Sequence, residues 1–157
     1  MENDINGEYD FKKDLVKGEL GENEIIEYMQ NLGFQFINRR NDNKYDFSMG
    51  YNGKIYTYEI KTDIFPRDTG NIAIEVESRG KPSGVSVTHA DYFVTYFKHL
   101  GEIWNIKTKN LLELIDNEGD DFRFIENAGD PGSNTKLYLI KKKDYKSHFR
   151  VHTIGKV

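Results

Sequence analysis

The stretch YDFSMGYNGKIYTYEIKTD, from Tyr45 to Asp63, carries the clearest structural signal in the sequence. Apolar and polar residues alternate on both sides of the pair Asn52-Gly53, which favours a type I′ hairpin turn because both turn positions need a positive φ. With this turn, counting outward places Asp46 opposite Glu59 in a non-hydrogen-bonded pair, where side chains come closest. A bulge would shift this register by one residue and cancel the pairing.

The polar face of this hairpin carries an unusual set of charges. The period of two places Glu59, Lys61 and Asp63 on one face of the second strand, on the same side as Asp46. Opposed like charges destabilise a sheet, but a divalent cation would neutralise them, since Mg²⁺ is typically held by one or two carboxylates, waters and phosphate oxygens. Lys61 could then orient or activate the attacking water, or neutralise charge at phosphorus. A solvated face of an edge hairpin is the ordinary alternative.

A third acid lies on the first predicted helix. Apolar residues at helical spacing predict this helix from about Phe11 or Gly18 to Leu32, with Gly33 as its stop. Glu22 occupies the apolar stripe that should pack on the sheet, where an acid without a partner is costly. The alternative is a fraying first turn, where acids complement the helix dipole.

The remaining elements indicate the fold class. The order of helix, strands, helix and strands predicts an α/β or α+β fold, with a mixed central sheet flanked by helices. Residues 1–157 are expected to form one domain. Strands are predicted at 34–37, 71–78, 92–97, 102–106, 121–125 and 137–142, a helical turn at 87–91, and a short helix at 108–116 that Thr108 could cap.

Composition limits the class of protein. The absence of cysteine excludes disulfides, a thiolate nucleophile and Cys-ligated metals. No apolar run approaches the roughly 18 to 20 residues of a membrane span, and the N-terminus does not resemble a signal peptide. We therefore expect no membrane partner and a cytoplasmic location, in the host cytoplasm if the protein is phage-encoded.

Charge is distributed unevenly along the chain. The net charge is −4, yet the segment from Lys136 to Val157 carries seven Lys and Arg against one acid. This basic C-terminal segment, with lysines interleaved with Tyr145 and Phe149, would suit contacts to a DNA backbone. A solvated C-terminal tail is the competing interpretation.

Other residues are weaker candidates for the site. Glu75 could reach the same metal if its strand pairs beside the second hairpin strand, although acids on a polar face are usually just solvated. A Gly- and Pro-rich loop region could contact phosphates through side chains and backbone N–H groups, or be an ordinary exposed loop; its candidates are Arg79, Lys81, Ser83 and His89. The four histidines show no metal-ligand spacing.

Glu22, Asp46, Glu59 and Lys61, in this order on helix, strand and strand, resemble the active-site pattern of the PD-(D/E)XK nuclease superfamily. Tyr45 stands where the motif's name has a proline. The resemblance implies a restriction-endonuclease-like fold, with Asp46 and Glu59 as metal ligands and Lys61 as the catalytic lysine. It also implies that Glu22 is an accessory ligand or orienting acid.

Two longer segments look like particular branches of this superfamily. KGELGENEIIEYMQNLGF, residues 17–34, is similar to the opening helix of archaeal-type Holliday-junction resolvases, which carry a glutamate five residues after the lysine of a KG pair. GNIAIEVESRGKPSGVSVTHADYF, residues 70–93, looks like the segment that follows the core in phage-type members.

The sequence thus predicts a Mg²⁺-dependent DNA endonuclease, with Mn²⁺ able to substitute, acting on branched, nicked or specific DNA. A homodimer is expected by analogy, because two strands are usually cut by two active sites. The alternative is a non-catalytic nucleic-acid-binding or assembly module that keeps the nuclease fold.

Overall fold

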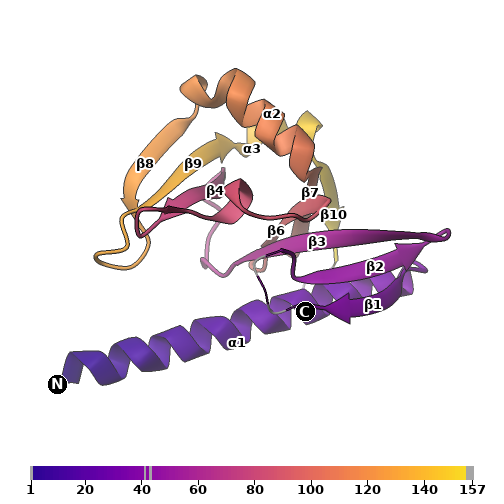
Figure 1. Ribbon diagram of the computed structural model, residues 1–157, viewed down its shortest axis with the longest axis horizontal. Coiled ribbons are helices and arrows are strands. Elements are labelled where there is room, and N and C mark those ends of the chain that lie inside the picture. The colour runs from indigo at the N-terminus through magenta and orange to yellow at the C-terminus, as the bar shows by residue number, and fades with distance from the viewer. Residues whose placement is uncertain (1, 41, 43, 155–157) are drawn as a thin grey trace.

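The computed structural model describes residues 2–40, 42 and 44–154, with side chains from Lys17 onward. Its elements form two sheets and their flanking helices (Figure 1). They are α1 (Glu2–Asn31), β1 (Gln35–Arg39), β2 (Phe47–Tyr51), β3 (Lys54–Asp63), β4 (Asn71–Ser78), β5 (Lys81–Pro82), η1 (Gly84–Ser86), β6 (Tyr92–Phe97), β7 (Glu102–Lys107), α2 (Thr108–Glu118), η2 (Gly119–Asp121), β8 (Arg123–Ala128), β9 (Thr135–Lys141), α3 (Lys142–Tyr145), η3 (Lys146–His148) and β10 (Arg150–Thr153).

The larger sheet is mixed and has the strand order β1-β2-β3-β6-β7-β10. Strands β3 and β6 are parallel, and the other neighbours in this sheet are antiparallel. Parallel neighbours need a long crossover, and the crossover from β3 to β6 contains β4 and β5, which join β9 and β8 in a second, four-stranded sheet. The predicted mixed α/β fold is confirmed, but the chain forms two sheets rather than one.

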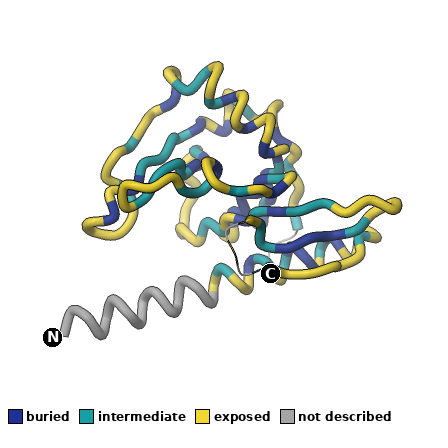
Figure 2. Tube along the Cα trace, in the orientation of Figure 1, coloured by how far each residue is buried: buried dark blue, intermediate teal, exposed yellow. Residues whose placement is uncertain are grey.

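Two apolar clusters cover opposite faces of the larger sheet. Helix α1 packs Ile25, Ile26 and Met29 against a cluster that includes Tyr58 and Ile60. The other cluster lies between this sheet, α2 and the second sheet, and the buried stretches of β3, β6 and β7 follow these two interfaces (Figure 2). Glu59 and Lys61 alternate with Tyr58 and Ile60, so they lie on the face of β3 away from α1.

The β2–β3 hairpin has the predicted turn and register. Asn52 and Gly53 both have a positive φ, of 51° and 77°, as a type I′ turn requires. Tyr51 pairs with Lys54, and the ladder continues without a bulge to the pair Phe47 and Tyr58.

Helix α1 ends as predicted but begins earlier. Gly33 has a φ of 100°, and the N–H of Phe34 donates to the Met29 carbonyl, which closes the helix. The helix starts at Glu2, so Glu22 lies well inside it and the fraying-turn alternative is wrong. Glu24, two residues after Glu22, accepts hydrogen bonds from the Tyr96 hydroxyl and the Lys98 ammonium. These bonds anchor the helix to the end of β6.

The start of α2 differs from the expectation that Thr108 would cap it. Strand β7 runs directly into the helix, so Lys107 occupies the N-cap position and makes no side-chain cap bond. Within the described part of the chain the buried Thr108 hydroxyl has no hydrogen-bond partner, while its N–H donates to the Asp91 carbonyl at 2.9 Å. The predicted helical turn at 87–91 is also wrong, because the turn η1 forms three residues earlier, at Gly84–Ser86.

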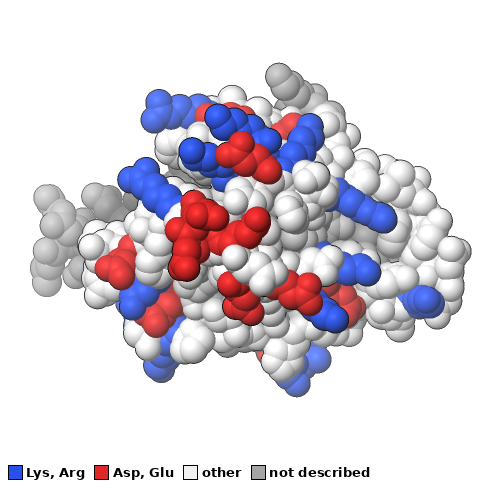
Figure 3. All heavy atoms as spheres, turned by 90° about the horizontal axis from the view of Figure 1, so that it is seen from above, with Lys and Arg blue, Asp and Glu red and all other residues white. Residues whose placement is uncertain are grey.

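The basic C-terminal segment is not a tail. Strand β9 belongs to the second sheet, and β10 pairs with β7 at the edge of the larger one. Lys142 is buried, with its Nζ 3.0 Å from Asp68 Oδ1 and 3.6 Å from the centre of the Phe97 ring, so it is not available to DNA. On the face seen from above, basic and acidic side chains are interspersed, with a group of acids near the middle (Figure 3).

Two glycines of α1 offer a matched test of how closely this helix approaches β3. A Cβ at Gly21 would overlap the Thr62 hydroxyl, whereas a Cβ at Gly18 would meet no atom of the described residues within 4 Å. Gly21→Ala is expected to destabilise the fold by about 1–3 kcal/mol through overpacking, whereas Gly18→Ala should stabilise it by up to about 1 kcal/mol. Urea unfolding measures both, and equal effects of the two substitutions would contradict this packing.

None of the described helices combines the length and apolarity needed to cross a membrane.

Candidate active site

Asp46 lies where β2 and β3 part. The ladder ends at Phe47 and Tyr58, one pair before the expected pairing of Asp46 with Glu59. The Asp46 N–H donates to the Tyr58 carbonyl at 2.9 Å, and Asp46 Oδ2 accepts the N–H of Ile60 at 2.7 Å. The carboxylate thus takes the place of a strand partner for β3, at the point where β3 begins to pair with β6.

Glu59 is half-buried beside this junction. Burial and, after it, the negative charge of Asp46 raise the pKa of Glu59 from its ordinary value of 4.5 to about 7, and Glu22 adds to the rise. The Thr88 hydroxyl donates to Glu59 Oε2 at 3.3 Å, and this bond and the charge of Lys61 oppose the rise of the pKa.

Glu22 faces the same centre from α1. Burial and then the charge of Asp46 raise the pKa of Glu22 to about 7, while the Arg39 guanidinium opposes this. Burial also raises the pKa of Asp46, while the hydrogen bond from the Ile60 N–H and the charge of Arg39 lower it. Asp46 thus lies near both Glu22 and Glu59, and burial is the largest cause of the raised pKa of all three carboxyl groups.

Lys61 lies next to these acids on the exposed side of β3. It pairs in register with Thr95 of β6 and lines a hollow of about 480 Å³ together with Asp63, the 64–66 segment and Ala73. Because its side chain is exposed, its ammonium can reach a ligand that lies over Glu59.

The donor set fits a hard divalent cation, because carboxylate oxygens are the ligands that Mg²⁺ and Mn²⁺ take. Among the residues that the structure describes, however, no three acidic or histidine side chains are arranged as a formed metal site. One oxygen of Asp46 is committed to Ile60. Glu22, Asp46 and Glu59 could therefore hold a cation only if their side chains turned toward a common point.

The weaker candidates lie in different places. Glu75 is on β4, which pairs with β5 and β9. Its strand therefore does not pair beside β3, as a metal-ligand role for Glu75 required. Ala73, on the same face of β4, nevertheless lines the hollow beside Lys61. Arg79 has a φ of 54° and its N–H donates to the Ser133 carbonyl in the second sheet.

The other loop candidates are also divided between the two sheets. Lys81 belongs to β5 in the second sheet, and the buried Ser83 hydroxyl has no hydrogen-bond partner among the residues that the structure describes. His89 is exposed beside Thr88, and its N–H donates to the Lys44 carbonyl at 2.8 Å. Of the four loop candidates, His89 is thus the one placed next to the residue that bonds Glu59.

Sequence reasoning missed Arg39 and Thr88. Arg39 Nη2 donates to Asn23 Oδ1 at 2.5 Å and faces both Asp46 and Glu22. Thr88 contacts Glu59 across 29 positions of the chain. No local pattern marks either residue, because both reach the site through tertiary contacts.

The raised pKa values predict a pH dependence of stability. Between pH 4.5 and 7 the carboxyl groups of Glu22 and Glu59 ionise in the unfolded chain but keep their protons in the folded one. Metal-free protein should therefore lose stability as the pH rises through this window, and stay at the lower level above it. Thermal unfolding in EDTA at pH 5 and pH 8 measures this, and Glu22→Gln/Glu59→Gln should reduce the loss. An equal loss in wild type and variant would contradict the assignment.

The fold is similar to that of a solved bacterial homing endonuclease, I-Ssp6803I, with a TM-score of 0.50 and 15% sequence identity, over 80% of this chain and 76% of that one. No protein-family model and no curated protein sequence matches the chain. At this identity the similarity shows the fold alone: the chain is a mixed α/β protein with a nuclease-like fold.

Proposed function

We propose that this chain is a divalent-cation-dependent endonuclease of the PD-(D/E)XK type that hydrolyses phosphodiester bonds in DNA. One observation carries the proposal: beside the point where β2 and β3 part, burial and, after it, the charge of Asp46 raise the pKa of both Glu22 and Glu59 to about 7. Perturbed carboxylates in a partly buried cluster are typical of functional sites, and Lys61 lies two residues from Glu59. The nuclease-like fold of the chain agrees with this assignment.

In this proposal Glu22, Asp46 and Glu59 hold Mg²⁺ or Mn²⁺. A bound cation would supply charge to bind phosphate oxygens and would lower the pKa of water. Lys61 places its ammonium beside the scissile phosphate, where it stabilises negative charge or orients the attacking water. The Ile60 N–H fixes the Asp46 carboxylate, and Thr88 orients that of Glu59.

A non-catalytic nucleic-acid-binding module is the second candidate. It is favoured by the lack of a formed three-ligand metal site among the described residues, and by the commitment of Asp46 to the backbone of β3. In such a protein the acids would remain from a nuclease ancestor, and DNA would bind without being cut.

A cleavage panel tests the proposal and defines its substrate. Supercoiled, linear, single-stranded and four-way-junction DNA are incubated with the protein in Mg²⁺, Mn²⁺ or EDTA. We expect metal-dependent cleavage of at least one form, lost in Glu59→Ala. Intact DNA in every form, with DNA binding preserved, would establish the non-catalytic module instead. The preferred form distinguishes a junction-specific enzyme from a duplex endonuclease, and light scattering on the same protein tests the expected homodimer.

A further inference from the structure

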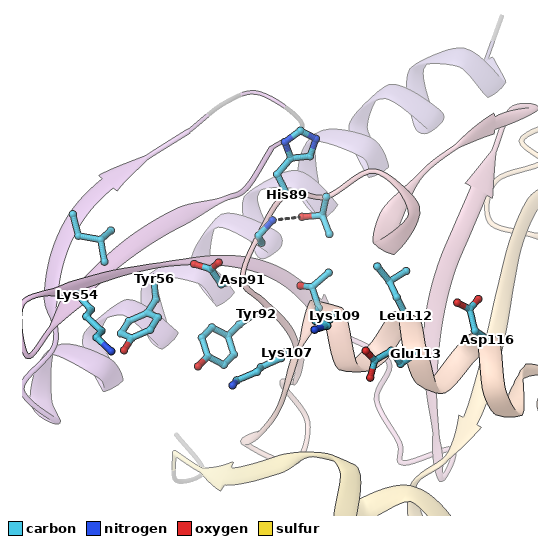
Figure 4. Close-up of a pocket in the computed structure, with 14 residues that line it drawn as sticks. Lys54, Tyr56, His89, Asp91, Tyr92, Lys107, Lys109, Leu112, Glu113 and Asp116 are labelled. Atoms are coloured by element: carbon cyan, nitrogen blue, oxygen red, sulfur yellow. Dashed lines mark hydrogen bonds between the residues drawn. The ribbon is translucent and has the colours of Figure 1, made fainter.

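A groove of about 880 Å³ lies beside the acidic centre, between the β2–β3 hairpin and the start of α2 (Figure 4). Its walls come from three segments that are far apart in the sequence. They are the first residues of β3, the loop before β6 with the first residue of β6, and the end of β7 with the α2 helix that follows it directly.

The groove is continuous with the acidic centre through Thr88. The hydroxyl of Thr88 contacts Glu59 Oε2 at 3.3 Å, and Thr88 also lines the groove. The wall at this end is fixed, because Asp91 Oδ2 accepts hydrogen bonds from both the N–H and the hydroxyl of Thr57, at 2.9 and 3.1 Å. The carboxylate of Asp91 is therefore already engaged by β3.

Three lysines from three elements line this groove: Lys54, Lys107 and Lys109. All three are exposed, and none of them pairs with an acidic side chain in the part of the chain that the structure describes. The acids of α2, Glu113 and Asp116, lie beyond Lys109 along the groove (Figure 4). At the end near the hairpin the lysines outnumber the carboxylate of Asp91, so the net charge there is positive.

Two tyrosine rings lie between these lysines. Tyr92 pairs in register with Lys107, and the rings of Tyr92 and Tyr56 are 6.0 Å apart. Figure 4 shows Lys54, Tyr56, Tyr92 and Lys107 following one another along the groove. Ammonium groups interleaved with half-buried aromatic rings are the combination that binds single-stranded nucleic acid, where phosphates meet the cations and bases stack on the rings.

We propose that this groove holds an unpaired strand of the DNA next to the cleavage site, so that the substrate carries a single-stranded arm. The inference rests on the proposed nuclease function, and it deepens that function by defining the class of DNA. A base in a duplex is already stacked, so the Tyr56 and Tyr92 rings add binding energy for an unpaired strand rather than for a blunt duplex. The acids of α2 limit the arm to the lysine-lined end.

Fluorescence anisotropy in EDTA tests the proposal without cleavage. We expect wild type to bind a forked oligonucleotide more tightly than a blunt duplex of the same length. Lys54→Ala/Lys107→Ala should lower affinity for the fork by about tenfold or more, and lower the slope of log K against log salt by about 0.7 for each lysine. Tyr56→Ala should also weaken fork binding, whereas Tyr56→Phe keeps the ring and the affinity. The control Arg123→Ala removes an exposed cation on β8. It should change neither the affinity for the fork nor the salt dependence of that affinity.

Equal affinity of wild type for fork and duplex would overturn the proposal, and so would variants that weaken both forms alike. Because the lysine side chains are exposed, the double lysine variant should unfold like wild type, which keeps the test valid if Tyr56→Ala is unstable. Cleavage of blunt duplex without fork preference would leave the nuclease function standing and reject the groove. Fork binding that depends on the lysines, without cleavage of any DNA, would support the groove and reject the nuclease function. Binding of an acidic peptide in place of the fork, lost in the same variants, would assign the groove to a protein partner.

Discussion

Glu59→Gln is expected to lower the rate of Mg²⁺-dependent nicking of supercoiled DNA by about a thousandfold. A carboxylate that holds a catalytic cation contributes several kcal/mol of transition-state stabilisation, and each 1.36 kcal/mol changes the rate about tenfold. The substitution keeps the size of the side chain and removes its charge. Nicking is measured by the conversion of supercoiled plasmid to open circle over time.

Asp63→Asn provides the matched control for this substitution. Asp63 lies on the same strand and face as Glu59, and its Oδ1 accepts the Phe65 N–H at 2.9 Å, a bond that the amide oxygen of asparagine can keep. This variant should nick DNA at close to the wild-type rate. Glu59→Gln should also be more stable than wild type at pH 8, because it removes a carboxylate whose ionisation burial disfavours. Equal activity of Glu59→Gln and Asp63→Asn would remove Glu59 from the site.

Lys61→Ala is expected to lower the single-turnover cleavage rate by about 10²–10³-fold, the usual effect of losing one group that stabilises transition-state charge. The affinity for DNA should change little, because an exposed lysine supplies at most one phosphate contact. Single-turnover rates and anisotropy titrations separate the two quantities.

Lys61→Arg completes this test. It keeps the positive charge but replaces a compact ammonium by a planar guanidinium, so it should recover part of the rate lost in Lys61→Ala. A loss of affinity without a loss of rate in Lys61→Ala would make Lys61 a binding residue. Full activity of Lys61→Ala would remove it from the reaction altogether.

Local signals in the sequence were sufficient for the hairpin and for the end of α1. Asn52-Gly53 and Gly33 need backbone conformations that few other residues adopt, so these positions determine turn, register and helix stop. The class of fold also followed from the order of elements. The second sheet did not, because alternation of side chains shows that Asn71–Ser78 is a strand but not which strand it joins.

The candidate site was predictable only in part, for the same reason. Glu22 stood out because it interrupts an apolar helical stripe, and the structure places it near Asp46 and Glu59. The ladder that suggested a direct pairing of Asp46 with Glu59 ends one residue earlier, where the Asp46 carboxylate accepts the N–H of Ile60 in place of a strand carbonyl. Thr88, Arg39 and the lysine-lined groove depend on contacts between distant segments, which no spacing along the chain reveals.

Titration calorimetry with Mn²⁺ measures whether Glu22, Asp46 and Glu59 hold a divalent cation. We expect saturable binding of at least one ion per chain near pH 7, with release of protons from Glu22 and Glu59, because their pKa values of about 7 leave them partly protonated there. Binding should disappear in Glu59→Gln and persist in Asp63→Asn. Absence of Mn²⁺ binding by folded wild-type protein, or equal binding by wild type and Glu59→Gln, would contradict a metal-binding role of the three carboxylates.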